Sequence, residues 1–412
     1  MAEVSAFRGL LYQPSLVQLD SVLAPPYDVI HPQLQLELYG RALQNVVRIE
    51  LGRDFEGDVP GERDRYTRAR DHLHAWLQEG VLVQDELPSV YVHRHSFRPP
   101  GGGGPRERLG CFVGVEPVAH ERREVLRHEL TMTAPRADRL RLLEATRVQT
   151  SPIFMLYEDA PAVTARLVEI VSAEAPFAEA VVAGEYGSER HQLWRASNPE
   201  IAAQVSKGLS QTRLFIADGH HRYETALNLG LRQVLTLVSP LADPGNVILP
   251  THRVVPQATR GVDSIAAELA RRGWRREPAS TVSEALALIG GLRAQAHAFG
   301  LIGTTGAEVV SRPRRSNPSP VLRLDVAVLE REILEPLLGI GSDAAAAGAV
   351  RFTRDAQEAH ALALALAGVA LLVNPPSVAE MAAVAVADEA MPQKSTYFFP
   401  KVPAGLVLMA LD

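Results

Sequence analysis

Apolar residues along the chain follow two periods, one typical of strands and one typical of helices. Short apolar or alternating runs predict strands at residues 46–51, 90–97, 109–115, 151–157, 214–217, 234–238, 246–249, 298–302, 369–373 and 405–411. Apolar positions three and four apart predict helices at residues 63–79, 137–146, 162–173, 201–209, 264–272, 282–295, 326–338, 356–367 and 378–387. Because the two kinds of element alternate, the pattern indicates an α/β fold of mixed sheets with helices on their faces.

The periodic pattern is interrupted at residues 186–191 and again at Ser197-Asn-Pro199. A chain of 412 residues is long enough for two domains. We therefore predict an N-terminal α/β domain over residues 1–195 and a C-terminal α/β domain over residues 196–412. A functional site shared between the two domains is compatible with this division.

Composition narrows the class of protein. The hydrophobic fraction of 46% and the charged fraction of 22% are ordinary for a globular domain. A net charge of −6 disfavours nucleic acid as the main partner, which needs a clustered basic face. The chain has no apolar run long enough to span a membrane, no signal-peptide pattern and a single cysteine, Cys111, interpreted as a core residue. We expect a cytoplasmic protein, whose oligomeric state the sequence leaves open.

The segment 214–227 carries the strongest functional signal. Its apolar run 214–217 reads as a buried strand, Asp218-Gly219 as a turn, and the residues from Tyr223 onward as a helix. Asp218, His220, His221 and Arg222 are thus predicted at the first turn of a helix. Free backbone N–H groups and the positive end of the helix dipole meet there, so this corner is predicted to bind an anion, most commonly phosphate.

Each residue of this corner suits phosphoryl transfer. Arg222 offers a planar fork for phosphate oxygens, and Gly219 allows the backbone to approach closely. Asp218 suits a Mg²⁺ ligand or a proton acceptor, and His220 or His221 a phosphate donor or acid–base group. The competing interpretation makes Asp218 a helix N-cap and the histidines packing residues.

Three further clusters are candidates. Residues 127–131 and 136–139 place charges, including His128, Glu129 and Arg139, beside a helix start; surface salt bridges explain them equally well. His128-Glu129 begins the zinc-protease motif, but Met132 replaces its second histidine and excludes that class. Asp28 ends the rigid segment Pro25-Pro-Tyr-Asp28 and is a candidate base, although a simple turn also explains the prolines.

The third cluster is Lys394-Ser395-Thr396, followed by Lys401. These side chains could close a phosphate pocket, and a surface loop is the alternative. His93 and His95 alternate on one strand face and are interpreted as exposed, since no further metal ligands can be placed. The chain lacks a Walker loop, a Gly-x-Gly-x-x-Gly fingerprint, a nucleophile elbow and a Cys-x-x-Cys pair, which removes the corresponding nucleotide, hydrolase and zinc classes.

Nearly the whole chain resembles a large bacterial family of unknown function. The motifs that carry the resemblance are Ala24-Pro-Pro-Tyr-Asp-Val-Ile30, Arg48-Ile-Glu-Leu-Gly52, His128-Glu129 with Thr131, Ala137-Asp-Arg-Leu140, Ala145-Thr146, Ser151-Pro-Ile-Phe154, Ala217-Asp-Gly-His-His-Arg-Tyr-Glu-Thr-Ala226, Ile248-Leu-Pro-Thr-His-Arg253 and Met391-Pro-Gln-Lys-Ser-Thr396.

Asp218-Gly-His-His-Arg222 is also similar to the motif of free-serine kinases with a ParB/sulfiredoxin-like fold. This resemblance implies a nucleotide-binding part of that fold. It implies phosphate binding by Gly219, His220, His221 and Arg222, and an acid or metal role for Asp218. Those kinases use an early acidic residue, for which Asp28 is the candidate by order along the chain.

Together these signals predict a phosphotransferase that moves phosphate from ATP or ADP, with Mg²⁺, to the hydroxyl of a small molecule, free L-serine first among the candidates. Asp28 or Glu129 is the predicted base, and Asp218 the predicted metal ligand. Gly219, His220, His221 and Arg222 hold phosphate, with His128, Arg139, Lys394, Ser395 and Thr396 as further candidates. Two alternatives stay open: a nucleotide-binding switch without rapid turnover, and a phosphatase or other hydrolase of a phosphorylated metabolite.

Overall fold

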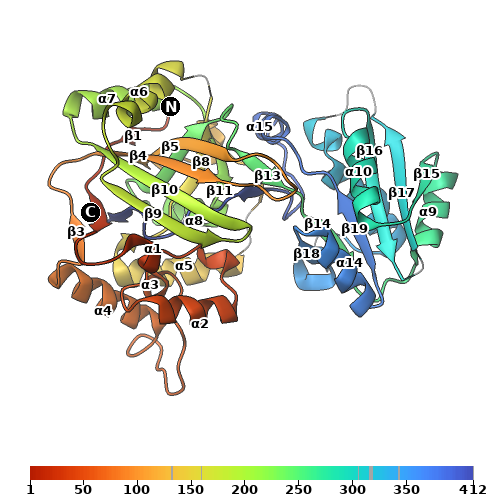
Figure 1. Cartoon of the computed structure of the whole chain (residues 1–412), viewed down its shortest axis with the longest axis horizontal. Helices are drawn as coiled ribbons and strands as arrows, with labels where there is room; N and C mark the ends of the chain where they lie inside the picture. Colours follow the sequence, from red (N-terminus) through yellow and green to blue (C-terminus); the bar gives the residue numbers. More distant parts are fainter. Residues whose placement is uncertain (131–132, 159, 305, 315–318, 342–343, 412) are drawn as a thin grey trace. The chain divides into compact units, whose positions relative to one another are not determined.

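The computed structural model describes residues 1–130, 133–158, 160–304, 306–314, 319–341 and 344–411. Thr131 and Met132, which the sequence motifs include, lie outside the described residues, as do the side chains of residues 133–136. The chain forms two compact units (Figure 1). Unit 1 consists of Met1–Arg127, Thr131–Val247 and Pro400–Asp412, and unit 2 of His128–Leu130 and Ile248–Phe399.

Unit 1 combines two sheets with helices. Its strands are β1 (Val4–Ser5), β2 (Gly9–Tyr12), β3 (Leu82–Gln84), β4 (Val90–Phe97), β5 (Arg106–Val115), β6 (Val125–Leu126), β7 (Val148–Gln149), β8 (Ile153–Tyr157), β9 (Ala178–Gly184), β10 (Gly187–Ala196), β11 (Leu214–Asp218), β12 (Val234–Pro240) and β21 (Leu408–Ala410). Its helices are α1 (Leu19–Val22), η1 (Tyr27–Val29), α2 (Pro32–Arg41), α3 (Val47–Glu50), α4 (Arg65–Gln78), η2 (His120–Arg122), α5 (Thr133–Thr146), α6 (Pro161–Ala173), α7 (Pro199–Leu209) and α8 (His220–Asn228).

The main sheet of unit 1 has the order β6-β11-β8-β12-β5-β4-β10-β9, with β1 paired to β5. The β11–β6 and β12–β8 pairs are parallel and the other pairs are antiparallel, so the sheet is mixed. A second sheet has the order β3-β2-β21-β7. The hydrophobic core joins one face of the main sheet to helices α6, α7 and α8 through residues such as Val92, Val113, Leu167, Val205 and Tyr223. This core holds the β11–α8 corner in place.

Unit 2 is built on a six-stranded sheet of order β15-β17-β16-β19-β14-β18. Its strands are β13 (Val247–Leu249), β14 (His252–Val255), β15 (Arg275–Ala279), β16 (Ala296–Gly303), β17 (Gly306–Pro313), β18 (Arg351–Thr353), β19 (Val369–Val373) and β20 (Tyr397–Phe399), of which β13 pairs with β20. Its helices are α9 (Val262–Arg271), α10 (Val282–Leu292), η3 (Pro320–Arg323), α11 (Asp325–Leu329), η4 (Glu330–Leu334), α12 (Glu335–Leu338), η5 (Ala345–Ala349), α14 (Ala356–Ala365) and α15 (Val378–Val386). Among the described residues, no helix combines the length and apolar character that crossing a bilayer requires.

The mixed α/β class is confirmed, and most predicted elements are present with ends that differ by a few residues. The strand predicted at 46–51 is wrong, because this segment is the single helical turn α3. The interruption at 186–191 is also wrong, since these residues belong to the hairpin of β9 and β10. The domain boundary predicted after residue 195 falls inside unit 1. Ser197-Asn-Pro199 there begins α7, with Asn198 as its N-cap.

Candidate functional site

The predicted corner lies at the junction of β11 and α8. The strand register shifts between Ile216 and Asp218, so β11 carries one extra residue relative to β8 at this point. Such a bulge re-aims the side chain that follows it. Gly219 then adopts a left-handed conformation (φ +93°), in which it serves as N-cap of α8 without any side-chain cap. Asp218 is therefore not the N-cap of this helix, and its carboxylate is left for other partners.

Two cations hold the Asp218 carboxylate. Lys401 Nζ contacts Oδ1, and Arg222 Nη2 donates to Oδ2 at 3.1 Å. Burial raises the pKa of Asp218, but the charges of Lys401 and Arg222 outweigh that effect and lower the pKa from 3.8 to about 2. All three side chains stay partly exposed, at 21% for Asp218, 14% for Arg222 and 10% for Lys401. Two positively charged side chains therefore contact the one carboxylate of Asp218, and all three keep some access to solvent.

Arg222 is fixed further by the carbonyl of Pro152, which accepts from Nη1. His220 and His221 are half-buried in the first turn of α8, and the charge of His220 also lowers the pKa of Asp218. The arrangement gathers a fixed guanidinium, an ammonium group, the imidazole of His220 and the positive end of a helix. Such a group of donors suits an anion with several oxygens, such as phosphate.

The early segment that contains Asp28 belongs to the same region of unit 1. The ring of Tyr27 lies under the Arg139 guanidinium, 4.0 Å from its centroid. Burial raises the pKa of Tyr27 to about 12, and the charges of Arg222, Asp28, Arg139 and Glu50 all act on it. Asp28 itself is exposed. The structure therefore brings the Asp28 segment and the Arg222 corner close together within one unit.

Arg139 is buried and its charge is compensated within the protein. It donates to Asp138 through Nε at 2.9 Å, and its Nη1 donates to the backbone oxygen of Glu50 at 2.9 Å and to Glu50 Oε1 at 3.4 Å. Thr150 donates to the other oxygen of Glu50. Arg139 thus holds Asp138 and Glu50 in place, and these bonds occupy donors that a ligand would need. Glu50 was not singled out as a site residue, although it lies inside the Arg48–Gly52 motif.

A cavity of about 60 Å³ opens beside Arg222. Its walls come from α3, α5, β7, β8 and α8, and they include Glu50, Arg139, Thr150, Ser151 and Arg222. Four of the segments by which the chain resembles its family therefore meet around one small space.

The other predicted site residues belong to unit 2. His128 is buried, and its Nε2 lies 2.9 Å from Thr396 Oγ1. Ser395 is buried and donates to the Pro392 carbonyl, Lys394 is exposed, and Glu129 is half-buried. The 128 and 394–396 segments, which were predicted as separate clusters, meet within this unit. Their predicted roles in phosphate binding and as a base stay predictions.

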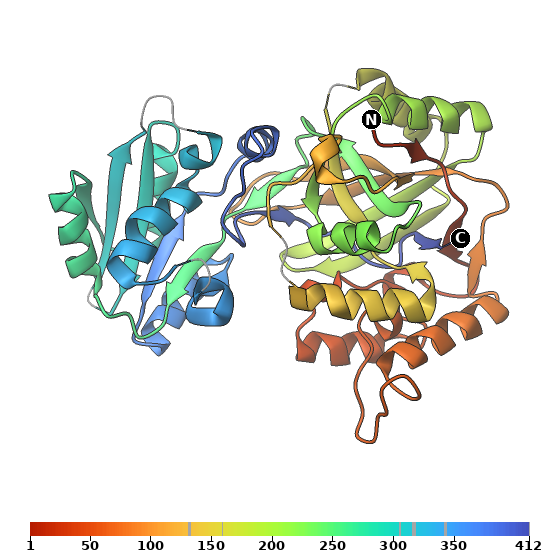
Figure 2. The same cartoon turned by 180° about the vertical axis from the view of Figure 1, so that it is seen from behind.

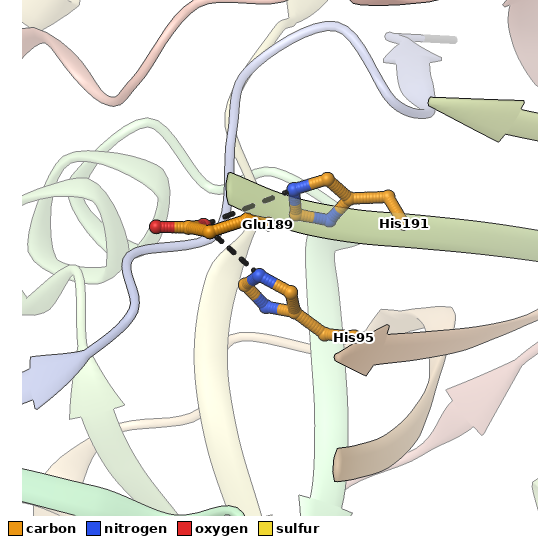
Figure 3. A group of neighbouring side chains, drawn as sticks. All are labelled: His95, Glu189 and His191. Carbon is orange, nitrogen blue, oxygen red and sulfur yellow. Dashed lines mark hydrogen bonds and ion pairs between the residues drawn. The ribbon is translucent and has the colours of Figure 1, made fainter. Parts of the chain in front are cut away.

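A second cluster of polar side chains lies inside unit 1, on the strands β4, β5 and β10. Figure 3 shows His95, Glu189 and His191 pointing toward one another. His93, His95 and His191 are fully buried, so the predicted exposure of the first two is wrong. Strand β10 pairs with β4 and places His191 directly opposite His95. Burial lowers the pKa of His191 to about 3 and raises that of Glu189 to about 7.

This cluster has ligand types that bind metals, since one ligand atom of each of the three residues in Figure 3 lies within 4.8 Å of the others. The buried Arg108 opposes that role. Its Nη2 lies 3.1 Å from His95 Nδ1, and arginine can only donate, so Nδ1 accepts. In neutral His95 the proton is then on Nε2, which donates to Glu189 Oε2 at 3.0 Å. A metal-bound histidine needs the reverse: Nε2 free of its proton and an acceptor beside Nδ1. The residues present therefore fit a directed hydrogen-bond chain better than a metal centre.

The family described as "Protein of unknown function (DUF1015)" matches residues 4–327. The chain belongs to this family. No curated protein matches it. Solved structures with a related arrangement include a free serine kinase in complex with AMP, at 11% identity and a TM-score of 0.35, covering 70% of this chain and 86% of that one. A conserved hypothetical protein from Pyrococcus furiosus has 13% identity and a TM-score of 0.35, with coverages of 72% and 93%. A C-terminally truncated SbnI from Staphylococcus aureus has 14% identity and a TM-score of 0.33, with coverages of 68% and 81%.

Proposed function

We propose that the protein is a small-molecule kinase that transfers a phosphoryl group from ATP or ADP to a hydroxyl, with free L-serine as the first acceptor to test. The observation that carries the proposal is the Asp218–Arg222–Lys401 arrangement at the start of α8. It supplies two cations with fixed positions, a glycine backbone and a helix N-terminus, which together suit the terminal phosphates of a nucleotide.

The proposed reaction moves one phosphoryl group. A base removes the proton of the acceptor hydroxyl, whose oxygen then forms a bond to the terminal phosphorus of the nucleotide. The bond from that phosphorus to its bridging oxygen breaks, and the shortened nucleotide leaves with the negative charge. Arg222 and Lys401 stabilise the charge on the phosphate oxygens during transfer. Asp28, which is exposed and follows Tyr27, a residue whose pKa is influenced by Arg222, is our candidate base.

Mg²⁺ belongs to the proposal as the usual companion of a nucleotide. Asp218 is the candidate protein ligand. Its lowered pKa keeps it charged at neutral pH, as a Mg²⁺ ligand must be. Both of its oxygens already bind cations, however, so a metal ion there has to share the carboxylate with Lys401 or displace it. A dependence of turnover on Mg²⁺ that Asp218→Asn weakens would support this role.

The test uses the full chain with ATP or ADP, Mg²⁺ and a panel of small alcohols that includes L-serine. Nucleotide consumption and a new phosphate ester are measured together. Arg222→Ala is the test variant. The matched control is Arg213→Ala, because Arg213 precedes the same strand but is 45% exposed and forms an ion pair with Glu158. The proposal expects acceptor-dependent transfer that Arg222→Ala abolishes and Arg213→Ala preserves.

The other outcomes overturn the kinase proposal in distinguishable ways. Phosphate release without an acceptor indicates a hydrolase. Tight nucleotide binding without consumption indicates a switch. Equal rates of nucleotide consumption by the wild type and Arg222→Ala with every acceptor would show that the corner has no part in the reaction.

A further inference from the structure

Arg108 is a charged residue in the interior of unit 1. It lies on β5, opposite His95 of β4, and its side chain is only 1% exposed. Burial lowers the pKa of Arg108 to about 10, so the guanidinium stays positively charged at neutral pH. Among the described residues, its Nε and Nη1 have no hydrogen-bond partner. A buried charge with unpaired donors costs free energy, and an apolar side chain of similar volume would usually cost less. Stability alone therefore does not explain an arginine here.

The remaining nitrogen of Arg108, Nη2, makes two hydrogen bonds. It donates to His95 Nδ1 at 3.1 Å and to the carbonyl oxygen of Pro400 at 3.0 Å. At Pro400 the last segment of the chain, at the dark-blue end of the colour scale in Figure 2, rejoins unit 1. The proline ring fixes one backbone angle, and the planar peptide joins the Pro400 carbonyl rigidly to the Cα of Lys401. A hydrogen bond to this carbonyl therefore restricts where the Lys401 side chain begins.

Arg108 also contacts the strand beside Asp218. Its guanidinium carbon lies 4.6 Å from the ring centroid of Phe154 on β8, which is a cation–π distance. Phe154 pairs directly with Asp218 of β11, at the point where the strand register shifts. Arg108 thus contacts the residue before Lys401 and the residue paired with Asp218. Lys401 and Asp218 are the two members of an ion pair at the corner.

We propose that Arg108 is a positioning residue of the phosphate corner. Through the Pro400 carbonyl and the Phe154 ring, it determines where the Lys401 ammonium group meets the Asp218 carboxylate. The inference rests on the proposed kinase function and deepens it, because it assigns the residue that prepares Lys401 for phosphate oxygens. A displaced ammonium group stabilises the charge of phosphoryl transfer less well, so the expected loss is in kcat and not in the acceptor KM.

Kinetics of phosphoryl transfer by the full chain test this coupling. The variants are Arg108→Met, Lys401→Ala and the double variant, and the control is Arg94→Met. Arg94 also stacks on an aromatic ring, that of Trp194 at 5.3 Å, but it adjoins His95 along β4, so its side chain lies on the other face of the sheet. We expect Arg108→Met to lower kcat about tenfold at an unchanged acceptor KM, and to cause little further loss in the Lys401→Ala background. Arg94→Met should match the wild type.

Chemical labelling of lysines tests the position of Lys401 without any turnover. The sequence has three lysines, Lys207, Lys394 and Lys401, so limited acetylation followed by peptide mass spectrometry resolves each of them. Lys207 and Lys394 are exposed, whereas Lys401 is 10% exposed and contacts Asp218. We expect Lys401 to react slowest in the wild type. Arg108→Met should raise its rate about fivefold, the effect of one lost hydrogen bond, and leave the Lys207 rate unchanged.

The outcomes separate this inference from the function on which it rests. Faster labelling of Lys401 in Arg108→Met, without phosphoryl transfer by any of the proteins, supports the positioning role and overturns the kinase. Transfer with the same kcat in the wild type and Arg108→Met supports the kinase and overturns the positioning role. Additive losses in the double variant, or an unchanged labelling rate of Lys401, also reject the assignment.

Thermal unfolding shows whether each variant folds. If Arg108→Met does not fold, Arg108→Lys replaces it in both experiments. Lysine keeps the buried charge but lacks the planar fork with which Arg108 reaches its acceptors, so the same changes in kcat and in labelling of Lys401 are expected. A folded Arg108→Lys protein that matches the wild type in both measurements would overturn the positioning role.

Discussion

Two regions of unit 1 are built from the same kinds of side chain and differ in what remains available for a ligand. The corner at Asp218 combines a carboxylate, histidines, an arginine and a lysine, and it stays partly exposed. The cluster of His93, His95, His191, Glu189 and Arg108, three of which are drawn in Figure 3, is almost completely buried. Residues 400–401 link them, because Arg108 donates to the Pro400 carbonyl and Lys401 binds Asp218.

The comparison shows that residue types alone do not define a site. In the buried cluster Arg108 donates a hydrogen bond to His95 Nδ1, and His95 Nε2 in turn donates one to Glu189. At the corner two cationic side chains contact one carboxylate, and all three side chains keep some access to solvent. Ligand binding is therefore our proposal for the corner, whereas the cluster contacts the Pro400–Lys401 segment through the bond from Arg108 to the Pro400 carbonyl.

The largest expected effect is on the corner. Lys401→Ala removes one of two cations from the proposed phosphate site, and the loss of one such stabilising group typically lowers turnover about 100-fold or more. The control is Lys207→Ala, an exposed position on α7. Steady-state kinetics of acceptor-dependent phosphoryl transfer provide the measurement. A Lys401→Ala enzyme as active as Lys207→Ala would contradict the comparison.

The buried cluster is expected to affect stability instead. His191 has a pKa of 6.5 when exposed and about 3 in the fold, because burial and the charge of Arg108 disfavour its protonated form. Protons therefore bind the unfolded chain as the pH falls below about 6.5, and stability is lost down to about pH 3, by at most about 5 kcal/mol from this residue. His191→Gln should flatten that part of a denaturation midpoint-versus-pH curve. Identical pH profiles for the variant and the wild type would show that His191 is not held neutral.

Glu189 should change the pH dependence of stability in the opposite direction from His191, and by a smaller amount. Burial outweighs the charge of Arg108 and raises the pKa of Glu189 from 4.5 to about 7. The folded chain retains a proton that the unfolded chain loses, so stability falls as the pH rises from about 4.5 to about 7, by up to about 3 kcal/mol. Glu189→Gln removes this slope in the same denaturation experiment. A variant whose stability still declines across this pH range would refute the assignment.

The smallest expected effect is that of metal ions on the cluster. His95 Nε2 carries a proton and donates a hydrogen bond to Glu189, so this nitrogen has no lone pair for a metal ion. We therefore expect Zn²⁺ to leave the melting temperature of the full chain unchanged. Arg108→Leu is the informative variant, since it frees His95 Nδ1 and permits the reverse tautomer. Stabilisation of the wild type by stoichiometric Zn²⁺, lost in His95→Phe, would make the cluster a metal site.

Local features of the fold could be predicted from the sequence, because short-range patterns determine them. Helix α4 has a continuous apolar stripe and a capping box at Asp64, and the turn between β11 and α8 is fixed by Asp218-Gly219. The strand prediction for the residues of α3 is wrong because one helical turn of four residues is too short to show a helical period in the sequence.

The long-range contacts of the site could not be predicted in the same way. Lys401 and Asp218 are 183 positions apart, and Arg139 and Glu50 are 89 apart. The burial of His95 depends on β10, whose polar hairpin sequence resembles a break between domains. Such contacts arise from the topology of the sheet, which periodicity alone does not specify.

The most direct test of the central claim is a nucleotide titration of the wild type, Arg222→Ala and Arg213→Ala by calorimetry, with ATP and ADP each in the presence of Mg²⁺. The account predicts that Arg222→Ala weakens binding at least about tenfold, while Arg213→Ala binds as the wild type does. Equal affinity of all three proteins, or no nucleotide binding by the wild type, would contradict the assignment of phosphate binding to the Asp218–Arg222 corner.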